Sequence, residues 1–131
     1  MGFSPSLWGK EGWHFIHYVA LNYPNKPTEE IKRRYERFFY SLKDVLPCEG
    51  CSYNYSEKIK KIPPDLTSKN SIFKWTVDIH NSVNVQNGKP EITYQKALKD
   101  LFDKYDKEQD KKILQTTTLV TLLFVVTLSV F

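Results

Sequence analysis

Prolines and a glycine divide this sequence into segments whose apolar residues recur every three or four positions. Such spacing places apolar side chains on one face of an α-helix, and proline ends a helix because it lacks an N–H and clashes with the preceding turn. The breaks fall at Pro24, Pro47, Pro63-Pro64 and Gly88. We find no alternation of apolar and polar residues typical of strands. The sequence therefore predicts an all-α fold, a bundle of four to five helices.

The ends of the expected helices carry recognisable signals. Ser4 precedes Pro5 as an N-cap residue precedes a proline at the first helical position, and Thr28 and Thr93 are residues of the kind that cap helices. The expected helices span residues 5–23, 29–46, 47–61, 72–85 and 94–105. The two cysteines of the chain then fall in the first turn of the third helix.

The end of the chain, residues 113–131, contains no charged side chain. A helix needs about 20 predominantly apolar residues to span a bilayer, and the hydroxyls in this segment can bond back to their own helix. We expect a domain over residues 1–105, a charged juxtamembrane linker over 106–112 and a transmembrane tail anchor over 113–131. A helix docked on the core and a partner-binding helix are the alternatives.

The distribution of charge suggests the side of the membrane and the kind of partner. Lys111 and Lys112 precede the uncharged segment, and basic residues favour the cytoplasmic side. No secretory signal is visible at the start, where Lys10 and Glu11 interrupt any apolar stretch. We therefore expect residues 1–112 to face the cytosol. The net charge is only +4, with acidic residues among the basic ones, which predicts solvated helix faces and no nucleic-acid partner.

The two cysteines form the motif Cys48-Glu49-Gly50-Cys51. Structural disulfides are rare in cytosolic proteins, and a Cys-x-x-Cys pair is suited to reversible exchange. At a helix start, the helix dipole and the unpaired N–H groups favour a thiolate. We expect Cys48 to be the more exposed thiol and Cys51 to point toward the bundle. A thioredoxin-like fold is disfavoured, because there the motif follows a strand and here it follows a helix.

Two other interpretations of the cysteines remain open at this stage. His14 and His17 are three residues apart and can share a helix face, so that with Cys48 and Cys51 they could hold zinc in a membrane-tethered interaction module. The other interpretation is a noncatalytic helical scaffold with buried free thiols.

A second segment, from Trp75 to Asn84, carries residues suited to a flat cofactor. A redox-active dithiol needs an electron carrier to react with oxygen, and a helical domain must hold that carrier within its bundle. Aromatic and imidazole rings stack on flat ring systems, and amides bond to ring edges or hydroxyls. The candidate residues are Trp75, His80, Asn81 and Asn84.

Four blocks in order make the chain similar to the Erv/ALR-type FAD-dependent sulfhydryl oxidases. The resemblance covers about residues 7–94. The blocks are 8–17 (WGKEGWHFIH), 23–28 (YPNKPT), 46–51 (LPCEGC) and 75–90, which contains HNSVN and GKP. The last block is highly specific, and the four together are much stronger evidence than an isolated Cys-x-x-Cys motif.

The resemblance implies a helical bundle around FAD, usually a non-covalent homodimer. It implies that Cys48 exchanges with a partner protein's dithiol and that Cys51 lies against the flavin, with electrons passing to oxygen to give hydrogen peroxide. Lys89 can also offset the pyrophosphate charge. The residues implied to bind FAD are Lys10, Trp13, His17, Tyr23, Cys51, Trp75, His80, Asn81, Val83, Asn84 and Lys89.

Two departures from the family pattern narrow this picture. Val77 and Tyr94 occupy the positions where many members have a structural disulfide, so packing alone must hold the bundle there. No further cysteine can act as a shuttle, so we expect the protein either to oxidise a partner dithiol directly, such as that of a thioredoxin-like or virion protein, or to receive electrons from a separate carrier. Such a form resembles the members encoded by large cytoplasmic DNA viruses, for which the expected location is the host cytoplasm and the virion membrane.

Overall fold

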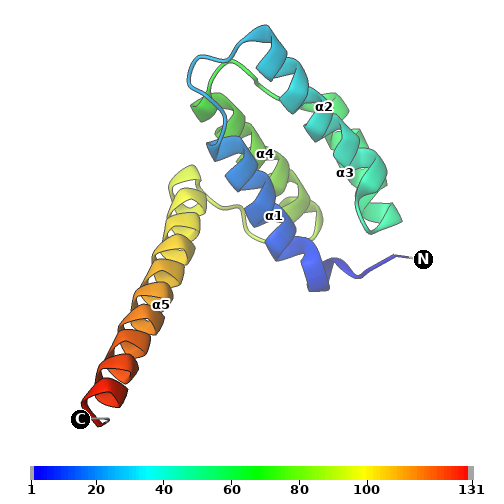
Figure 1. Ribbon diagram of the computed structural model, residues 1–131. Helices are drawn as coiled ribbons and strands as arrows, with labels where there is room; N and C mark the ends of the chain where they lie inside the picture. The colour runs from blue at the N-terminus through cyan, green and yellow to red at the C-terminus, as the bar shows by residue number, and fades with distance from the viewer. Residues whose placement is uncertain (1, 130–131) are drawn as a thin grey trace. The chain divides into compact units, whose positions relative to one another are not determined.

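The structure, a computed structural model, describes the backbone of residues 2–129 and the side chains of residues 2–126. Over this range the chain forms α-helices and no strand, which confirms the all-α prediction. The helices are α1 (Pro5–Leu21), α2 (Glu29–Val45), α3 (Glu49–Lys61), α4 (Lys69–Gln86) and α5 (Tyr94–Ser129) (Figure 1).

The chain divides into two compact units, residues 1–94 and residues 95–131. The first unit contains α1 to α4, and the second contains α5 beyond its first residue. α5 is a single helix that continues through residues 106–112. The predicted division of the chain at residues 105 and 112 stays a prediction.

Side-chain caps explain where the helices begin. Thr28 accepts a hydrogen bond from the Ile31 N–H at 3.2 Å and starts α2 as expected. α4 begins three residues earlier than predicted, because Ser68 accepts a hydrogen bond from the Ser71 N–H at 3.1 Å. α3 begins two residues later than predicted, because Cys48 itself occupies the N-cap.

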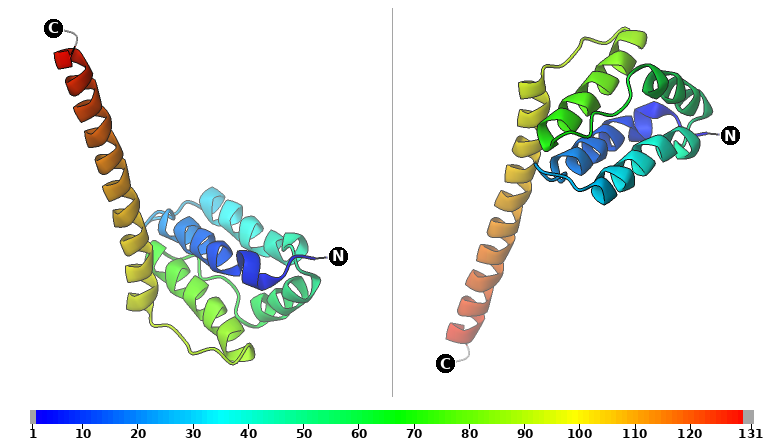
Figure 2. Two further views of the ribbon diagram at one scale, coloured as in Figure 1. Left: turned by 90° about the horizontal axis from the view of Figure 1, so that it is seen from below. Right: turned by 90° about the horizontal axis from the view of Figure 1, so that it is seen from above.

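Two helix pairs build the first unit. α1 packs along α4 and α2 packs along α3, with further contact between α3 and α4 (Figures 1 and 2). Phe39 of α2 and Trp75 of α4 meet edge to face, with ring centroids 4.8 Å apart. The Tyr55 hydroxyl of α3 donates to the Phe39 carbonyl at 3.0 Å. These aromatic contacts join α2, α3 and α4 in one buried core.

The segment after α4 is held by more than packing. The Asn81 side chain donates to the Ile92 carbonyl and accepts from the Ile92 N–H, both at 2.9 Å. The Tyr94 hydroxyl donates to Asp78 at 2.7 Å. The expectation that packing alone holds the bundle near Val77 and Tyr94 is therefore wrong, because these polar contacts join α4 to the segment that follows it.

The predicted transmembrane anchor is not confirmed. Among the residues whose side chains are described, no helix is long and apolar enough to cross a membrane. The last part of the predicted anchor, residues 127–131, lies outside this range. The hydroxyls of Thr116, Thr117 and Thr118 donate to the carbonyls four residues earlier, as we expected for this segment.

Candidate redox site

The first unit contains a cavity of about 690 Å³ lined by α1, α3, α4 and the turns beside them. Its volume lies within the range of roughly 300–1,000 Å³ typical of ligand sites. Residues distant in the sequence therefore meet around one space large enough for a cofactor. The predicted site residues that line it are Lys10, Trp13, Cys48, Cys51, His80, Val83, Asn84 and Lys89.

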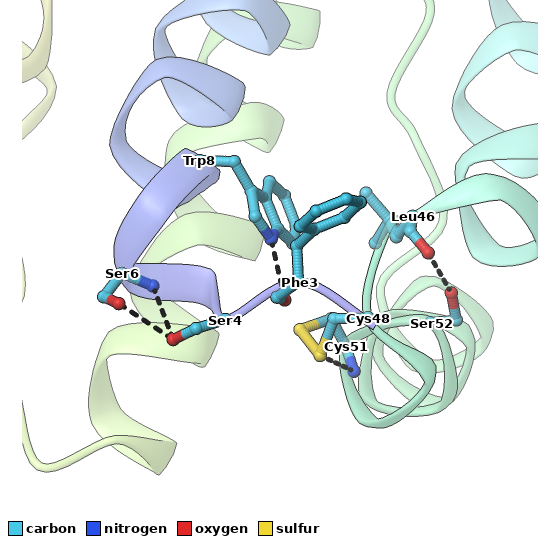
Figure 3. The surroundings of a disulfide bond; sticks show 8 residues. All are labelled: Phe3, Ser4, Ser6, Trp8, Leu46, Cys48, Cys51 and Ser52. Atoms are coloured by element: carbon cyan, nitrogen blue, oxygen red, sulfur yellow. Dashed lines mark hydrogen bonds between the residues drawn. A yellow bond between two sulfur atoms is a disulfide. The ribbon is translucent and has the colours of Figure 1, made fainter. Parts of the chain in front are cut away.

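Cys48 and Cys51 are joined by a disulfide (Figure 3). Both residues line the cavity. The two Cα atoms are 5.1 Å apart, and both residues are half-buried, so the structure does not make Cys48 distinctly more exposed than Cys51. The Cys48 Sγ accepts a hydrogen bond from the Cys51 N–H at 3.2 Å. Once the disulfide is reduced, this N–H and the helix dipole favour a thiolate on Cys48.

Residues 2–4, the N-terminal arm that precedes α1, lie beside this disulfide (Figure 3). The Phe3 N–H donates to the Pro47 carbonyl at 2.7 Å, and the Trp8 indole N–H donates to the Phe3 carbonyl at 3.2 Å. A Cβ at Gly2 would lie only 3.3 Å from the Cys48 Cα. The residues just before Cys48 are thus tied to the start of α1.

An aromatic stack lies on the α1 and α4 side of the cavity. The rings of Trp13 and His80 are nearly parallel, at 9°, with centroids 4.3 Å apart. Behind them His17 is almost completely buried, and its Nε2 lies 3.3 Å from the His80 Nδ1. The Nδ1 of His17 lies 2.9 Å from the Thr76 hydroxyl. The cavity is therefore lined by the stacked rings of Trp13 and His80, and the His17 ring lies within hydrogen-bond distance of His80.

Burial keeps the two neighbouring imidazoles of His17 and His80 neutral. It lowers the pKa of His17 to about 3, with smaller effects from the charges of His80 and His14. It lowers the pKa of His80 to about 4, with smaller effects from His14 and Lys89. Near pH 7 each ring therefore has one N–H donor and one bare nitrogen.

Amide and ammonium groups complete the cavity wall. Asn84 is about nine-tenths buried and lines the cavity. Its backbone carbonyl accepts the Lys89 N–H at 2.8 Å across the turn at Gly88, where φ is +65°. Glycine suits this turn because a side chain would strain a positive φ. The turn places Lys89 at the cavity.

Four other predicted site residues do not line the cavity. His17 lies directly behind His80. Trp75 lies in the core and donates its indole N–H to the Ile62 carbonyl at 2.8 Å. Tyr23 is fully buried and donates its hydroxyl to the Leu66 carbonyl at 2.8 Å. Asn81 bonds the backbone of Ile92, as described above. Whether any of them contacts a cofactor stays a prediction.

Sequence reasoning missed several residues of the cavity wall. Asn54 lies three residues after Cys51 on α3, which puts both on one helix face, and this spacing could have indicated it. We did not predict the other lining residues as site residues, although Trp8, Gly9, Gly12, Leu46 and Gly50 belong to the sequence blocks that carry the family resemblance. These other lining residues are Pro5, Ser6, Trp8, Gly9, Gly12, Ile16, Leu46, Gly50, Tyr55, Gln86 and Asn87.

The alternative interpretations of the cysteines are not supported. In the part of the chain that the structure describes, no three His, Cys, Asp or Glu side chains are placed to hold a metal. Cys48 and Cys51 are joined in a disulfide, so they are neither thiolate ligands nor buried free thiols. The fold and the site together define a helical protein with a redox-capable disulfide beside a cofactor-sized cavity.

The comparisons with known proteins narrow this class to one family. The model of the Erv1 / Alr family matches residues 10–121. This chain therefore belongs to the Erv1 / Alr family, and the resemblance predicted from the four sequence blocks is confirmed.

Named relatives agree with that assignment. The chain is 49% identical to the probable FAD-linked sulfhydryl oxidase R368 of Acanthamoeba polyphaga mimivirus, over 72% of this chain and 68% of that protein. It is 37% identical to the putative FAD-linked sulfhydryl oxidase 347L of Invertebrate iridescent virus 6, over 66% of this chain and 84% of that protein. These two relatives support the predicted likeness to members from large DNA viruses.

A solved structure shares the fold. The FAD binding domain of Erv1 from Saccharomyces cerevisiae is 26% identical in sequence and superposes with a TM-score of 0.72. The match covers 77% of this chain and 96% of that chain.

Proposed function

We propose that this protein is an FAD-linked sulfhydryl oxidase that forms disulfide bonds in partner proteins. The observation that carries the proposal is the placement of the Cys48–Cys51 disulfide in the wall of the same cavity as the Trp13–His80 stack. The family membership and the named relatives support it.

The residues of the cavity fit FAD. The parallel rings of Trp13 and His80 offer a flat surface to a flat ring system. The buried amide of Asn84 faces the cavity with its hydrogen-bonding groups available to a ligand. Lys89 supplies a cation that suits a pyrophosphate. This set of groups matches a long ligand with aromatic ends, hydroxyls and two phosphates.

The two cysteines carry the exchange with the partner. A partner thiolate attacks the Cys48 Sγ, the bond between Cys48 and Cys51 breaks, and Cys51 leaves as a thiolate. The partner's second thiolate attacks the partner's own sulfur in this mixed disulfide and releases Cys48. The N-cap position of Cys48 favours this second step, because it stabilises the departing thiolate.

The overall exchange is balanced in electrons and protons. The partner loses two electrons and two protons as its disulfide forms, and the Cys48–Cys51 pair gains them as a dithiol. Bound FAD supplies a two-electron acceptor that oxygen can reoxidise, with release of hydrogen peroxide.

An absorption spectrum of the purified full chain tests this function. We expect flavin bands that dithiothreitol bleaches under nitrogen and that air restores with formation of hydrogen peroxide. A protein that stays colourless after refolding with FAD would contradict the proposal.

Two variants locate the chemistry in the proposed residues. Cys51→Ser should keep bound flavin but prevent its reduction by thiols, and His80→Ala should lower flavin occupancy. Tyr53→Phe, an exposed change two residues from Cys51, is the matched control and should behave as the unmodified protein. Normal turnover by Cys51→Ser would refute the role of the disulfide.

The remaining expectations concern assembly and location, and we propose them here. The exposed Phe15 and Tyr18 of α1 support a non-covalent homodimer. The exposed aliphatic side chains between Leu119 and Val126 support membrane attachment through residues 113–131. Lys111 and Lys112, which precede this segment, favour the cytosolic side for residues 1–112. The partner is a protein dithiol, such as a thioredoxin-like or virion protein, and the location is the host cytoplasm and the virion membrane.

A further inference from the structure

A buried hydroxyl on α4 has only one direction in which to donate its proton. Thr76 is fully buried, and its Oγ1 lies 2.7 Å from the Phe73 carbonyl, to which it donates. Two oxygens at this distance need a proton between them, since a carbonyl can only accept. The Thr76 hydroxyl proton is therefore committed to Phe73, and toward any other neighbour this oxygen acts as an acceptor.

That acceptor determines which nitrogen of His17 carries the proton. The His17 Nδ1 lies 2.9 Å from the Thr76 Oγ1, so Nδ1 must carry a hydrogen and donate it. Burial keeps the His17 ring neutral, because it lowers the pKa to about 3. A neutral imidazole has a single N–H, so the His17 Nε2 is bare and accepts.

The bare His17 Nε2 in turn determines which nitrogen of His80 carries the proton. The His80 Nδ1 lies 3.3 Å from the bare His17 Nε2, so Nδ1 of His80 carries the hydrogen and donates it. His80 is neutral as well, because burial and the charges of His14 and Lys89 lower its pKa. Its Nε2 is therefore bare.

The free nitrogen of His80 is open to the cavity. In the described part of the chain no buried side-chain nitrogen or oxygen lacks a hydrogen-bond partner. The His80 Nε2 makes no hydrogen bond to these residues, so it is an atom that cavity solvent reaches, and His80 lines the cavity. A stack at 9° with Trp13 holds the ring in this orientation.

We propose that Thr76 and His17 are positioning residues that fix His80 with its proton on Nδ1, so that Nε2 offers a hydrogen-bond acceptor to the cavity. The His80 Nε2 would accept a hydrogen bond from a hydroxyl or amino group of FAD, and this part of the inference rests on the proposed function. Neither Thr76 nor His17 lines the cavity, so both act through His80.

Nitrogen NMR of the labelled, flavin-free full chain tests the proton positions directly. Protonated and bare imidazole nitrogens resonate in well-separated ranges, so each ring can be assigned to one tautomer. We expect Nδ1–H and bare Nε2 for both His17 and His80. A proton on Nε2 of either ring in the unmodified protein would overturn the proposal, whatever becomes of the variants.

Thr76→Val tests the direction of the relay. Valine keeps the shape but offers no acceptor, so His17 should shift its proton to Nε2 and donate to His80, which should then carry its own proton on Nε2. Thr76→Ser, which keeps a hydroxyl, is the matched control and should restore the original tautomers. Unchanged tautomers in Thr76→Val would overturn the role of Thr76.

Flavin binding separates this inference from the proposed function. Loss of one neutral hydrogen bond should raise the FAD dissociation constant of Thr76→Val about fivefold, whereas Thr76→Ser should match the unmodified protein. Equal affinity in Thr76→Val, together with altered tautomers, would refute the acceptor role of Nε2. A full chain that binds no FAD would refute the proposed function, while the NMR spectra would still decide the tautomers.

Discussion

At the scale of single residues, His17 and His80 both have a strongly lowered pKa and lie against each other beside the cavity. Burial is the largest cause of the lowered pKa in both. Such rings resist protonation in the folded state but accept protons freely once the chain unfolds. The pair therefore makes the stability of the fold depend on pH.

The pH dependence has a definite sign. Between about pH 6.5 and the folded-state pKa values, the unfolded chain binds more protons, so stability is full above pH 6.5 and falls as the pH falls. His17 alone should cost about 2 kcal/mol between pH 7 and pH 5, and His80 should add to that loss. Urea unfolding of the flavin-free protein at both pH values measures the difference.

A matched variant assigns this pH dependence to the buried ring. His17→Gln removes the titrating group, so its unfolding free energy should change less between pH 7 and pH 5 than that of the unmodified protein. Equal pH dependence in both proteins would show that other groups dominate.

Single residues also show where reasoning from sequence reached its limit. Trp75 and His80 both belong to the specific block that identified the family, and we predicted that both contact the cofactor. They are five residues apart, which places them about 140° apart around a helix. Accordingly Trp75 packs on Phe39 in the core, whereas His80 lines the cavity. A sequence motif indicates which residues are needed but not which face each one occupies.

At the scale of elements, capping side chains determined the boundaries that the sequence left uncertain. Proline and apolar spacing predicted the existence of each helix correctly, because these signals act over several residues. The starts of α3 and α4 each depend on one hydrogen bond, which the side chain of Cys48 or Ser68 accepts. Polar residues of this kind are common in loops as well. The link between α4 and Ile92 depends on one amide, which no spacing indicated.

That amide makes a prediction about the segment after α4. Asn81→Leu removes both hydrogen bonds to the backbone of Ile92 and leaves its N–H and carbonyl without these partners. We expect a loss of about 2 kcal/mol in the free energy of unfolding. Urea unfolding gives this value, and hydrogen exchange at the Ile92 amide should become faster.

The control for this change lies on the same helix. Asn70 is exposed and close to the start of α4, so Asn70→Leu should leave both the unfolding free energy and the Ile92 exchange rate nearly unchanged. If Asn81→Leu proved as stable as this control, the paired bonds would contribute little and packing would suffice there after all.

For the whole molecule, the ordering of four short blocks was the strongest information in the sequence. It identified the family that the comparison confirms, although the cavity itself depends on contacts between α1, α3 and α4 that no local pattern specifies. The side chains that line the cavity lie between Pro5 and Lys89, and they belong to the unit of residues 1–94.

Because the lining residues lie within residues 5–89, we predict that removing residues 113–131 abolishes membrane attachment but not thiol oxidation. A chain of residues 1–112 should bind FAD and oxidise thiols at the rate of the full chain, because every lining residue is kept. In flotation with vesicles of phosphatidylcholine and phosphatidylserine, the full chain should rise with the lipid and the shortened chain should stay below. A full chain that stays below would contradict attachment through residues 113–131. Loss of flavin from the shortened chain would show that residues beyond 112 support the cavity.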